Sequence, residues 1–298
     1  MPKLQRLLRD PRRVIGFLAR RRLLDFLPDR PFLRLHYWSV LHGSLDLAHP
    51  VTFNQKLQWL KLYDRNPLYT TLVDKAAVKE YVASKIGERY VIPTLGLWDS
   101  FEDIDFDRLP DQFVLKCTHD SGGLILCRDK AALDRSEAAA RIRKTLRTNY
   151  YKHNREWPYK DVPRKVIAEQ LLVDARGELP RDYKFFCFHG EPKAMFIVSN
   201  RAVDARNDFF DMDFHHLPMV HGHPNADVMP EKPATFEEMK RIAAQLSQGI
   251  PQVRVDLYEL DGRVYFGELT FFDWGGLGPF TPACWDETFG SWLTLPRP

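Results

Sequence analysis

The chain has 298 residues, of which 44% are hydrophobic and 28% are charged, as in an ordinary soluble globular enzyme. A net charge of +3 is too small to indicate a nucleic-acid-binding protein, so no nucleic-acid partner is expected. No run approaches the roughly 18 consecutive apolar residues of a membrane span. Charges interrupt every early apolar run, so we expect no signal peptide.

The first fifty residues form a basic amphipathic leader (1–50). Eight Lys and Arg side chains within its first 22 residues interleave with Leu, Ile, Val and Phe. This pattern can lie on an anionic membrane surface, here through residues 1–24. The alternative is a helix that packs on the body of the protein with its arginines in solvent, and Asp10 and Pro11 interrupt the first part of the pattern.

Apolar spacing and end signals predict helices in four further places. Gly87 is suited to end the second helix, Ser136 to cap the third, and Thr235 to begin a capping box at the start of the fourth. The predicted helices span residues 54–63, 71–86, 135–151 and 235–249.

Short β-like runs alternate with these helices and predict strands at 113–117, 124–127, 165–172, 183–188 and 193–199. A hairpin is predicted from Arg254 to Thr270, because Asp261-Gly262 is a strong hairpin-turn signal. The segment 202–232 is rich in His, Asp, Asn and Pro and is interpreted as a long functional loop or insertion. Two units that each combine helices with antiparallel hairpins indicate an α+β protein.

The Arg254–Thr270 hairpin carries the most informative charges. If its register places Asp256 beside Glu268, two carboxylates share a sheet face with Arg254 and need a cation. Carboxylate oxygens of this kind suit Mg²⁺, which takes one or two carboxylates together with substrate phosphates. The alternative is a solvated hairpin face with ordinary salt bridges.

Three other segments carry charges next to apolar runs. Lys116 ends a strand beside a Ser-Gly-Gly loop, which suits phosphate binding, although the segment also fits a plain hairpin turn. Glu169 interrupts an apolar strand, where a charge is costly to bury unless it is paired. Asp182 and Lys184 share a strand face, so Lys184 either reaches a phosphate or pairs with Asp182.

Cysteine and histidine do not predict a zinc site. No two cysteines form a C-x-x-C pair, and we expect all four to be small buried hydrophobic residues in a reducing compartment: Cys117, Cys127, Cys187 and Cys284. Four histidines lack the helical spacing and the cysteine partner of a zinc site and are assigned to a substrate loop: His215, His216, His221 and His223.

The order of these motifs resembles the ATP-grasp superfamily. A lysine at the head of a helix (Lys75) precedes the Lys116 loop, the Glu169 strand and the carboxylate hairpin. The stretches 53–69 and 116–123 resemble the TupA-like branch, which is associated with teichuronopeptide and other surface-polysaccharide synthesis. The resemblance implies two α+β subdomains that clasp a nucleotide. They would span 91–175 and 176–298, after a helical region at 51–90.

The resemblance also implies a role for each motif residue, with ATP and Mg²⁺ as substrate and cofactor. Arg254 stabilises the reacting acyl centre, with Lys184 beside it, and the metal ligands are Asp256, Glu268 and Thr270. Thr270 stands where the family usually has Asn, so a second metal ion is in question. Asp174 or Glu178 is a loose candidate for the ribose. ATP is assigned to Lys75, Lys116, Ser121, Gly122, Gly123, Glu169, Gln170, Leu171, Leu172 and Asp182.

The implied function is ATP-dependent amide formation through an acyl phosphate. An amino acid or other amine would be joined to a uronic acid of a capsular or other cell-surface polysaccharide. The alternatives are a sugar kinase on the same scaffold and a non-catalytic nucleotide- or glycan-binding component. ATP use places the protein in the cytoplasm, with the leader as a contact to the inner face of the membrane. Side chains of the insertion either bind an anionic sugar or serve loop packing: Arg201, Arg206, Phe209, Phe210, His215 and His216.

Overall fold

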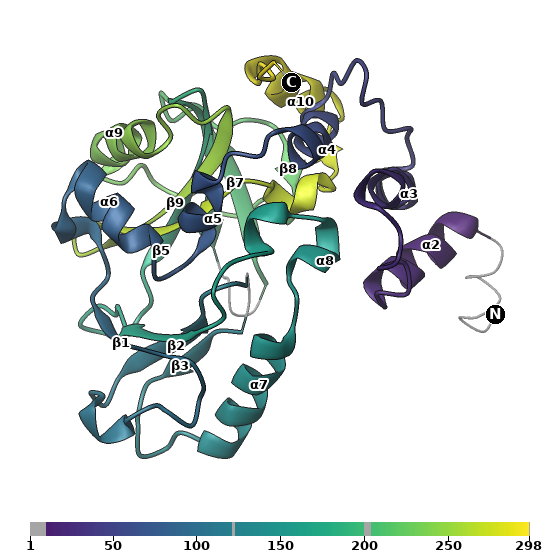
Figure 1. Cartoon of the computed structure of the whole chain (residues 1–298). Coiled ribbons are helices and arrows are strands. Elements are labelled where there is room, and N and C mark those ends of the chain that lie inside the picture. Colours follow the sequence, from purple (N-terminus) through teal and green to yellow (C-terminus); the bar gives the residue numbers. More distant parts are fainter. Residues whose placement is uncertain (1–9, 121–122, 200–203, 298) are drawn as a thin grey trace.

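The structure is a computed structural model that describes residues 10–120, 123–199 and 204–297. Two antiparallel sheets lie one above the other, and the N-terminal helices project to one side of them (Figure 1). The protein therefore combines helices with antiparallel sheets, as the sequence predicts.

The first sheet has the strand order β1-β4-β2-β3. Its strands are β1 (Thr94–Trp98), β2 (Phe113–Cys117), β3 (Ile125–Cys127) and β4 (Val166–Gln170). Helix α7 (Arg135–Arg147) buries Ala138, Ala139 and Ile142 in the core of this sheet. Asp134, rather than the expected Ser136, caps α7, because the Asp134 carboxylate accepts the Glu137 amide at 2.9 Å. The predicted helix ends before Tyr151, where a separate turn, α8 (Tyr151–Asn154), begins.

The second sheet has the order β10-β9-β5-β6-β7. Its strands are β5 (Arg181–Phe188), β6 (Glu191–Ser199), β7 (Arg206–Phe210), β9 (Gln252–Leu260) and β10 (Arg263–Thr270). Helix α9 (Phe236–Leu246) packs its apolar face on this sheet, and Thr235 forms no side-chain cap, so the capping-box prediction is wrong. The turn between β9 and β10 is confirmed, with positive φ at both Asp261 and Gly262.

The insertion contributes structure rather than forming only a loop. β7 pairs with β6, and β8 (Val220–His221) pairs with β11 (Phe280–Thr281). Of the two alternatives for this segment, the one of a loop over its whole length is therefore wrong, and the one of an insertion stays a prediction. Consecutive apolar residues at the end of β7 explain the difference, because Phe209 and Phe210 are both buried in the main core.

The helix predicted over 71–86 is broken in two. α5 (Leu68–Val73) and α6 (Val78–Ile86) are separated by a turn at Asp74, whose carboxylate accepts the amides of Ala76 and Ala77. The turn brings the backbone N–H of Lys75 within 3.2 Å of the Thr118 carbonyl, at the end of β2. The break therefore joins the helical region to the first sheet.

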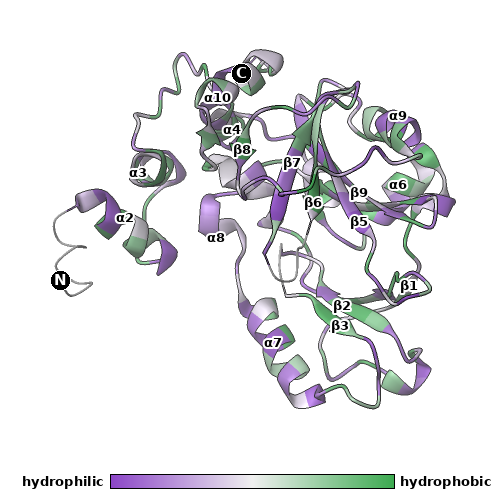
Figure 2. Cartoon of the chain, turned by 180° about the vertical axis from the view of Figure 1, so that it is seen from behind, coloured by the Kyte–Doolittle hydropathy of each residue, from purple (hydrophilic) through white to green (hydrophobic). Residues whose placement is uncertain are grey.

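The N-terminal helices and the C-terminal helix complete the molecule. They are α2 (Pro11–Arg20), α3 (Asp29–Leu41), α4 (Phe53–Tyr63) and α10 (Cys284–Trp292). α4 begins with a capping box between Thr52 and Gln55. Figure 2 shows α2 and α3 on the outside, away from both sheets. Three cysteines are buried as expected, but Cys284 is exposed, because it begins α10 at the surface. Within the described ranges, the helices are all too short or too polar to cross a bilayer.

Candidate active site

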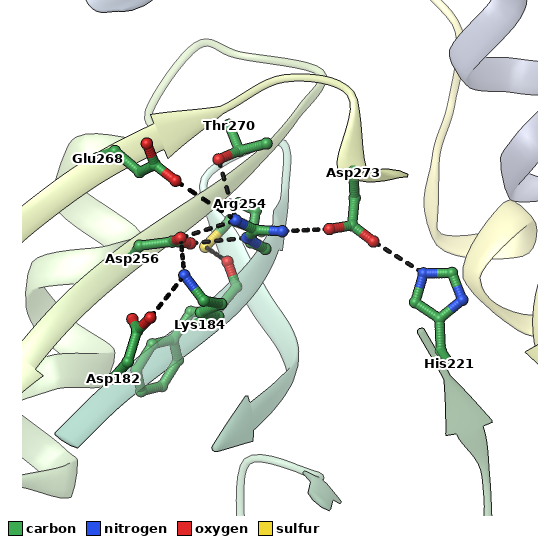
Figure 3. A network of polar contacts seen from close by, with 10 residues as sticks. Asp182, Lys184, His221, Arg254, Asp256, Glu268, Thr270 and Asp273 are labelled. Carbon is green, nitrogen blue, oxygen red and sulfur yellow. Dashed lines mark hydrogen bonds and ion pairs between the residues drawn. The ribbon is translucent and has the colours of Figure 1, made fainter. Parts of the chain in front are cut away.

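The charged residues of the hairpin gather on one face of the second sheet (Figure 3). Glu268 of β10 lies opposite Asp256 of β9, and Asp256 lies opposite Lys184 of β5. The β9–β10 register shifts between Phe266 and Glu268. Without this bulge at Gly267, the glycine would stand opposite Asp256. The bulge therefore places the two predicted metal ligands side by side.

Arg254 is the centre of this cluster. Its Nε and Nη2 atoms each lie 2.7 Å from one oxygen of Asp256, and Nη2 donates to the Thr270 hydroxyl at 3.1 Å. Nη1 pairs with Asp273. Burial alone would lower the pKa of Arg254, but the charges of Asp256 and Asp273 raise it well above its ordinary value. The guanidinium is therefore a fixed cation on a buried sheet face.

Lys184 pairs with Asp182, as one of the sequence interpretations expects, and also with Asp256. Its Nζ is 2.9 Å from Asp182. Burial lowers the pKa of Lys184, but the charges of the two aspartates outweigh it and raise the pKa. Lys184 thus holds Asp256 from the side opposite Glu268.

Glu268 is the least engaged carboxylate of the cluster. Its side chain is 37% exposed, and its ion pair is a 3.7 Å approach to Arg254. Burial raises the pKa of Glu268, but four cations together lower it to about 2, and they come from both sides of the site: Lys184, Lys75, Arg254 and Lys116. Glu268 therefore carries its negative charge near Lys184 and Arg254 of the second sheet, Lys116 of the first sheet, and Lys75 of the turn between α5 and α6.

On the first sheet, Glu169 is buried and bridges two lysines. One of its oxygens lies 2.5 Å from Lys116 Nζ, and the other lies 2.5 Å from Lys79 Nζ. Burial raises the pKa of Glu169, but the two ammonium groups outweigh it and lower the pKa. The side chain of Glu169 is thus paired, as a buried charge in this strand requires, and it bridges two lysines whose combined charge it offsets only in part.

Lys79 was not identified from the sequence. It stands four residues after Lys75, and a lysine pair at this spacing would face the same side of a helix. That spacing was an available signal. Lys79 also donates to the Ile92 carbonyl at 2.6 Å. Burial lowers the pKa of Lys79, although the negative charge of Glu169 acts to raise it.

Other residues assigned to ATP lie around this lysine cluster. Lys75 donates to the Asp120 carbonyl, at the start of the predicted phosphate loop. Ser121 and Gly122 lie outside the described residues. Gly123 has φ +65°, where a Cβ would approach Asp120 Oδ2 to 2.9 Å, so the conformation requires glycine. In the predicted hinge, the Gln170 amide donates to the Pro93 carbonyl at 3.0 Å, while Leu171 and Leu172 are buried.

Asp273 extends the cluster beyond the predicted residues and joins it to His221, which the sequence analysis assigns to a substrate loop but which is buried in β8. His221 Nε2 lies 2.8 Å from Asp273 Oδ2, and Nδ1 lies 3.1 Å from the Pro279 carbonyl. The imidazole also stacks on Phe280, with ring centroids 4.0 Å apart. Burial raises the pKa of Asp273, but Arg254 and His221 outweigh it and lower the pKa. The chain of contacts runs from the insertion to Arg254.

The loop that follows Asp273 is held by α4. Lys61 Nζ donates to the Gly275 carbonyl at 2.6 Å, and Gln58 Nε2 donates to the Gly276 carbonyl at 2.6 Å. Both glycines have positive φ. Burial lowers the pKa of Lys61 to about 8. The stretch that resembles the TupA-like branch therefore supports the loop beside the charged cluster.

Among the insertion side chains proposed for an anionic sugar, Phe210 and His216 lie in contact, with ring centroids 5.6 Å apart. Phe209 and Phe210 are core residues, so the packing alternative holds for them. Arg206 pairs with Asp204 at 2.5 Å, and Arg201 lies outside the described residues. Among the described residues, the one group of at least three His, Cys, Asp or Glu side chains spaced for a metal ion is Asp211, Asp213 and His215. Asp211 there accepts the amides of Asp213 and His215, as in a simple turn.

The oxygen donors fit Mg²⁺. Glu268 offers a charged, partly exposed carboxylate, with Asp256 and the Thr270 hydroxyl beside it. In a Mg²⁺–phosphate site, the protein usually provides one or two carboxylate ligands, and the substrate phosphates provide others. Both oxygens of Asp256 contact Arg254 in this arrangement, so Glu268 would be the first ligand.

Comparisons with known proteins agree with this reading of the sequence. The family described as TupA-like ATPgrasp matches residues 55–294. No curated protein matches. Among solved structures, D-alanine–D-alanine ligase from Bacillus anthracis complexed with ATP is 16% identical, with a TM-score of 0.40, over 67% of this chain and 54% of that chain. The ATP-grasp ligase PsnB complexed with minimal precursor is 11% identical, with a TM-score of 0.41, over 81% of this chain and 63% of that chain.

A third structure, D-cycloserine synthetase DcsG, is 15% identical, with a TM-score of 0.38, over 69% of this chain and 64% of that chain. This chain spans about half the length of the first solved structures that it matches, between 44% and 57% of them. The family match over most of the chain, rather than these distant likenesses, identifies the fold as ATP-grasp.

Proposed function

Because this chain belongs to the TupA-like ATP-grasp family, we propose that it is an ATP-dependent ligase that joins a carboxylate to an amine. The observation that carries the proposal is the position of Glu268. It pairs with Asp256 across the hairpin and carries its charge among lysines of both sheets. Such an arrangement suits the triphosphate tail of ATP, which needs both cations and a divalent metal.

In the proposed reaction, a substrate carboxylate oxygen attacks the γ-phosphorus of ATP and releases ADP. The amine then attacks the acyl phosphate, phosphate leaves, and an amide bond forms. Lys75 and Lys116 would bind phosphate oxygens, and Lys184 would hold Asp256 in place. Mg²⁺ on Glu268 and Asp256 would supply charge neutralisation to the phosphates. Arg254, fixed by three acidic neighbours, would stabilise the oxyanion of the tetrahedral intermediate.

We propose a uronic acid of a capsular or other cell-surface polysaccharide as the carboxylate, and an amino acid or other amine as the nucleophile. The support for this substrate is the TupA-like family itself. A cytoplasmic location follows in this proposal from the use of ATP, and the free thiols of Cys117, Cys127 and Cys187 are compatible with it.

The test is a screen of uronic acids against amino acids, read as nucleotide and phosphate products. The proposal expects ADP and phosphate, released only when both the uronate and the amine are present. AMP and pyrophosphate would reject the acyl-phosphate route. A stable phosphorylated sugar formed without an amine would assign the protein as a kinase.

A further inference from the structure

Helix α2 packs on the rest of the protein through its smallest side chains. Gly16 and Ala19 are buried, and a Cβ on Gly16 would lie 3.7 Å from Ser39 Oγ of α3. Phe17, in contrast, is 37% exposed. An ordinary surface helix turns its large apolar side chains toward the core. α2 therefore presents a large apolar side chain to solvent and uses its small residues for packing.

The exposed apolar side chains continue after α2. Leu23 is 58% exposed, and Phe26 is 79% exposed. Three large apolar side chains within ten residues are unusual on a protein surface with nothing to cover them. We call the segment 17–26 the leader surface.

The backbone of the leader surface is fixed by contacts with the body of the protein. Arg155, the residue after α8, is buried, and its guanidinium donates to the carbonyls of Asp25 at 3.3 Å and Leu27 at 3.1 Å. The same guanidinium stacks over Phe32 of α3, 4.3 Å from the ring centroid. A frayed end would lack such contacts, so the exposure of Leu23 and Phe26 belongs to a fixed backbone.

The charge of this region is opposite to that of the rest of the chain. Residues 1–26 contain eight Lys or Arg and two Asp, a net charge of +6, while the whole chain carries +3, so the other 272 residues carry −3. Arg20 and Arg21 are exposed, and within the described ranges neither forms an ion pair. Arg21 lies over the Phe17 ring, 5.5 Å from its centroid.

We propose that the leader surface docks on an anionic lipid bilayer. Phe17, Leu23 and Phe26 would insert among the headgroups, and Arg20 and Arg21 would pair with lipid phosphates. Apolar side chains beside unpaired arginines are the combination that binds to membrane surfaces without spanning them. The remainder of the leader has another role, since Phe32, Leu33 and Tyr37 belong to the main core. The proposal is independent of the chemistry at the active site.

The experiment measures co-sedimentation of the full chain with vesicles. Phosphatidylcholine vesicles that contain phosphatidylglycerol are compared with phosphatidylcholine alone. We expect binding only to the anionic vesicles, and weaker binding as salt rises. The combined variant Phe17→Ser, Leu23→Ser, Phe26→Ser should lose binding. A matched variant, Leu97→Ser, Leu179→Ser, Val228→Ser, changes residues that are 44%, 44% and 82% exposed and should bind as the parent does.

A charge variant gives a second measurement that leaves the apolar side chains unchanged. Arg20→Gln with Arg21→Gln should weaken binding about fivefold per arginine, the factor that corresponds to ~1 kcal/mol. Arg141→Gln with Arg147→Gln, exposed on α7, should have no effect.

Failure of the parent chain to bind anionic vesicles would overturn the proposal. So would a serine triple variant that binds like the parent. If sedimentation showed that the triple variant splits a dimer while vesicle binding stays unchanged, the surface would be an interface between two copies of the chain.

Discussion

His221 Nε2 lies 2.8 Å from Asp273 Oδ2, and the other oxygen of Asp273 pairs with Arg254 (Figure 3). All three side chains are buried. His221 thus fixes the carboxylate that in turn fixes the guanidinium. Arg254 can direct its charge at a reacting centre only if its acidic neighbours hold their positions.

We predict that His221→Leu lowers kcat about tenfold, since a buried carboxylate oxygen that loses its partner costs roughly 1–3 kcal/mol. The KM for ATP should change little, because Arg254 is assigned to the acyl centre and not to the nucleotide. His221→Gln keeps an amide donor and should recover part of the loss. His49→Leu, at an exposed position, is the control. Equal activity of His221→Leu and the parent would show that Asp273 holds Arg254 unaided.

Glu268→Gln removes the carboxylate on which the proposed metal site depends. We expect kcat to fall roughly 10²–10³-fold, the size of effect seen when one preorganised electrostatic group is lost. The Mg²⁺ concentration needed for half-maximal activity should also rise. Glu191→Gln, on an exposed β6 side chain, should match the parent in both measurements. An unaltered Mg²⁺ dependence in Glu268→Gln would move the metal site elsewhere.

Lys79→Met leaves one oxygen of buried Glu169 without its cation. We expect a loss of about 3 kcal/mol in the free energy of unfolding near neutral pH. Lys85→Met, on the exposed side of α6, should cost far less. The measurement is urea denaturation of each variant.

The same substitution has a predicted pH dependence. The pKa of Glu169 in the folded protein lies below the ordinary 4.5. Its stabilisation is therefore present above that value and is lost as the pH falls through the folded pKa. The difference in free energy of unfolding between Lys79→Met and the parent should therefore become smaller at acid pH. If this difference in free energy of unfolding did not change with pH, Lys79 would stabilise the folded protein through packing alone.

Lys61 provides a test at alkaline pH. Burial lowers its pKa from 10.5 to about 8, so between these values the unfolded chain binds more protons than the folded protein. The contribution of Lys61 to the free energy of unfolding therefore rises with pH between about 8 and 10.5. We expect Lys61→Met to remove that rise and to destabilise the protein, because the Gly275 and Asn154 carbonyls lose their donor. Parallel stability profiles of variant and parent from pH 8 to 10.5 would contradict the prediction.

The sequence predicts most of the elements, because apolar period and turn residues are local signals. The break in the 71–86 helix was missed, since the apolar spacing continues through Asp74, whose carboxylate accepts the amides of Ala76 and Ala77 and forms a turn there. The strand β7 was missed because polar neighbours on both sides in the sequence outweighed Phe209 and Phe210.

The charged face of the hairpin was predicted, but its register was not. A bulge at Gly267 is decided by packing of the whole sheet, and no residue pattern alone fixes it. The pairing of Asp273 with His221 was missed for a different reason, since His221 was assigned only to a substrate loop. They are 52 residues apart, and only the pairing of β8 with β11 brings them together. Lys79 could have been found from its spacing to Lys75.

The bulge at Gly267 also sets how this hairpin can vary between relatives. Glu268 stands twelve positions after Asp256, and this separation determines which side chain stands opposite which. One residue inserted or deleted within either strand would turn an acid toward the wrong side. Related chains should therefore vary in residue identity between positions 256 and 268 but keep the length of this segment constant. An alignment gap inside it would mark a chain that has abandoned the chemistry.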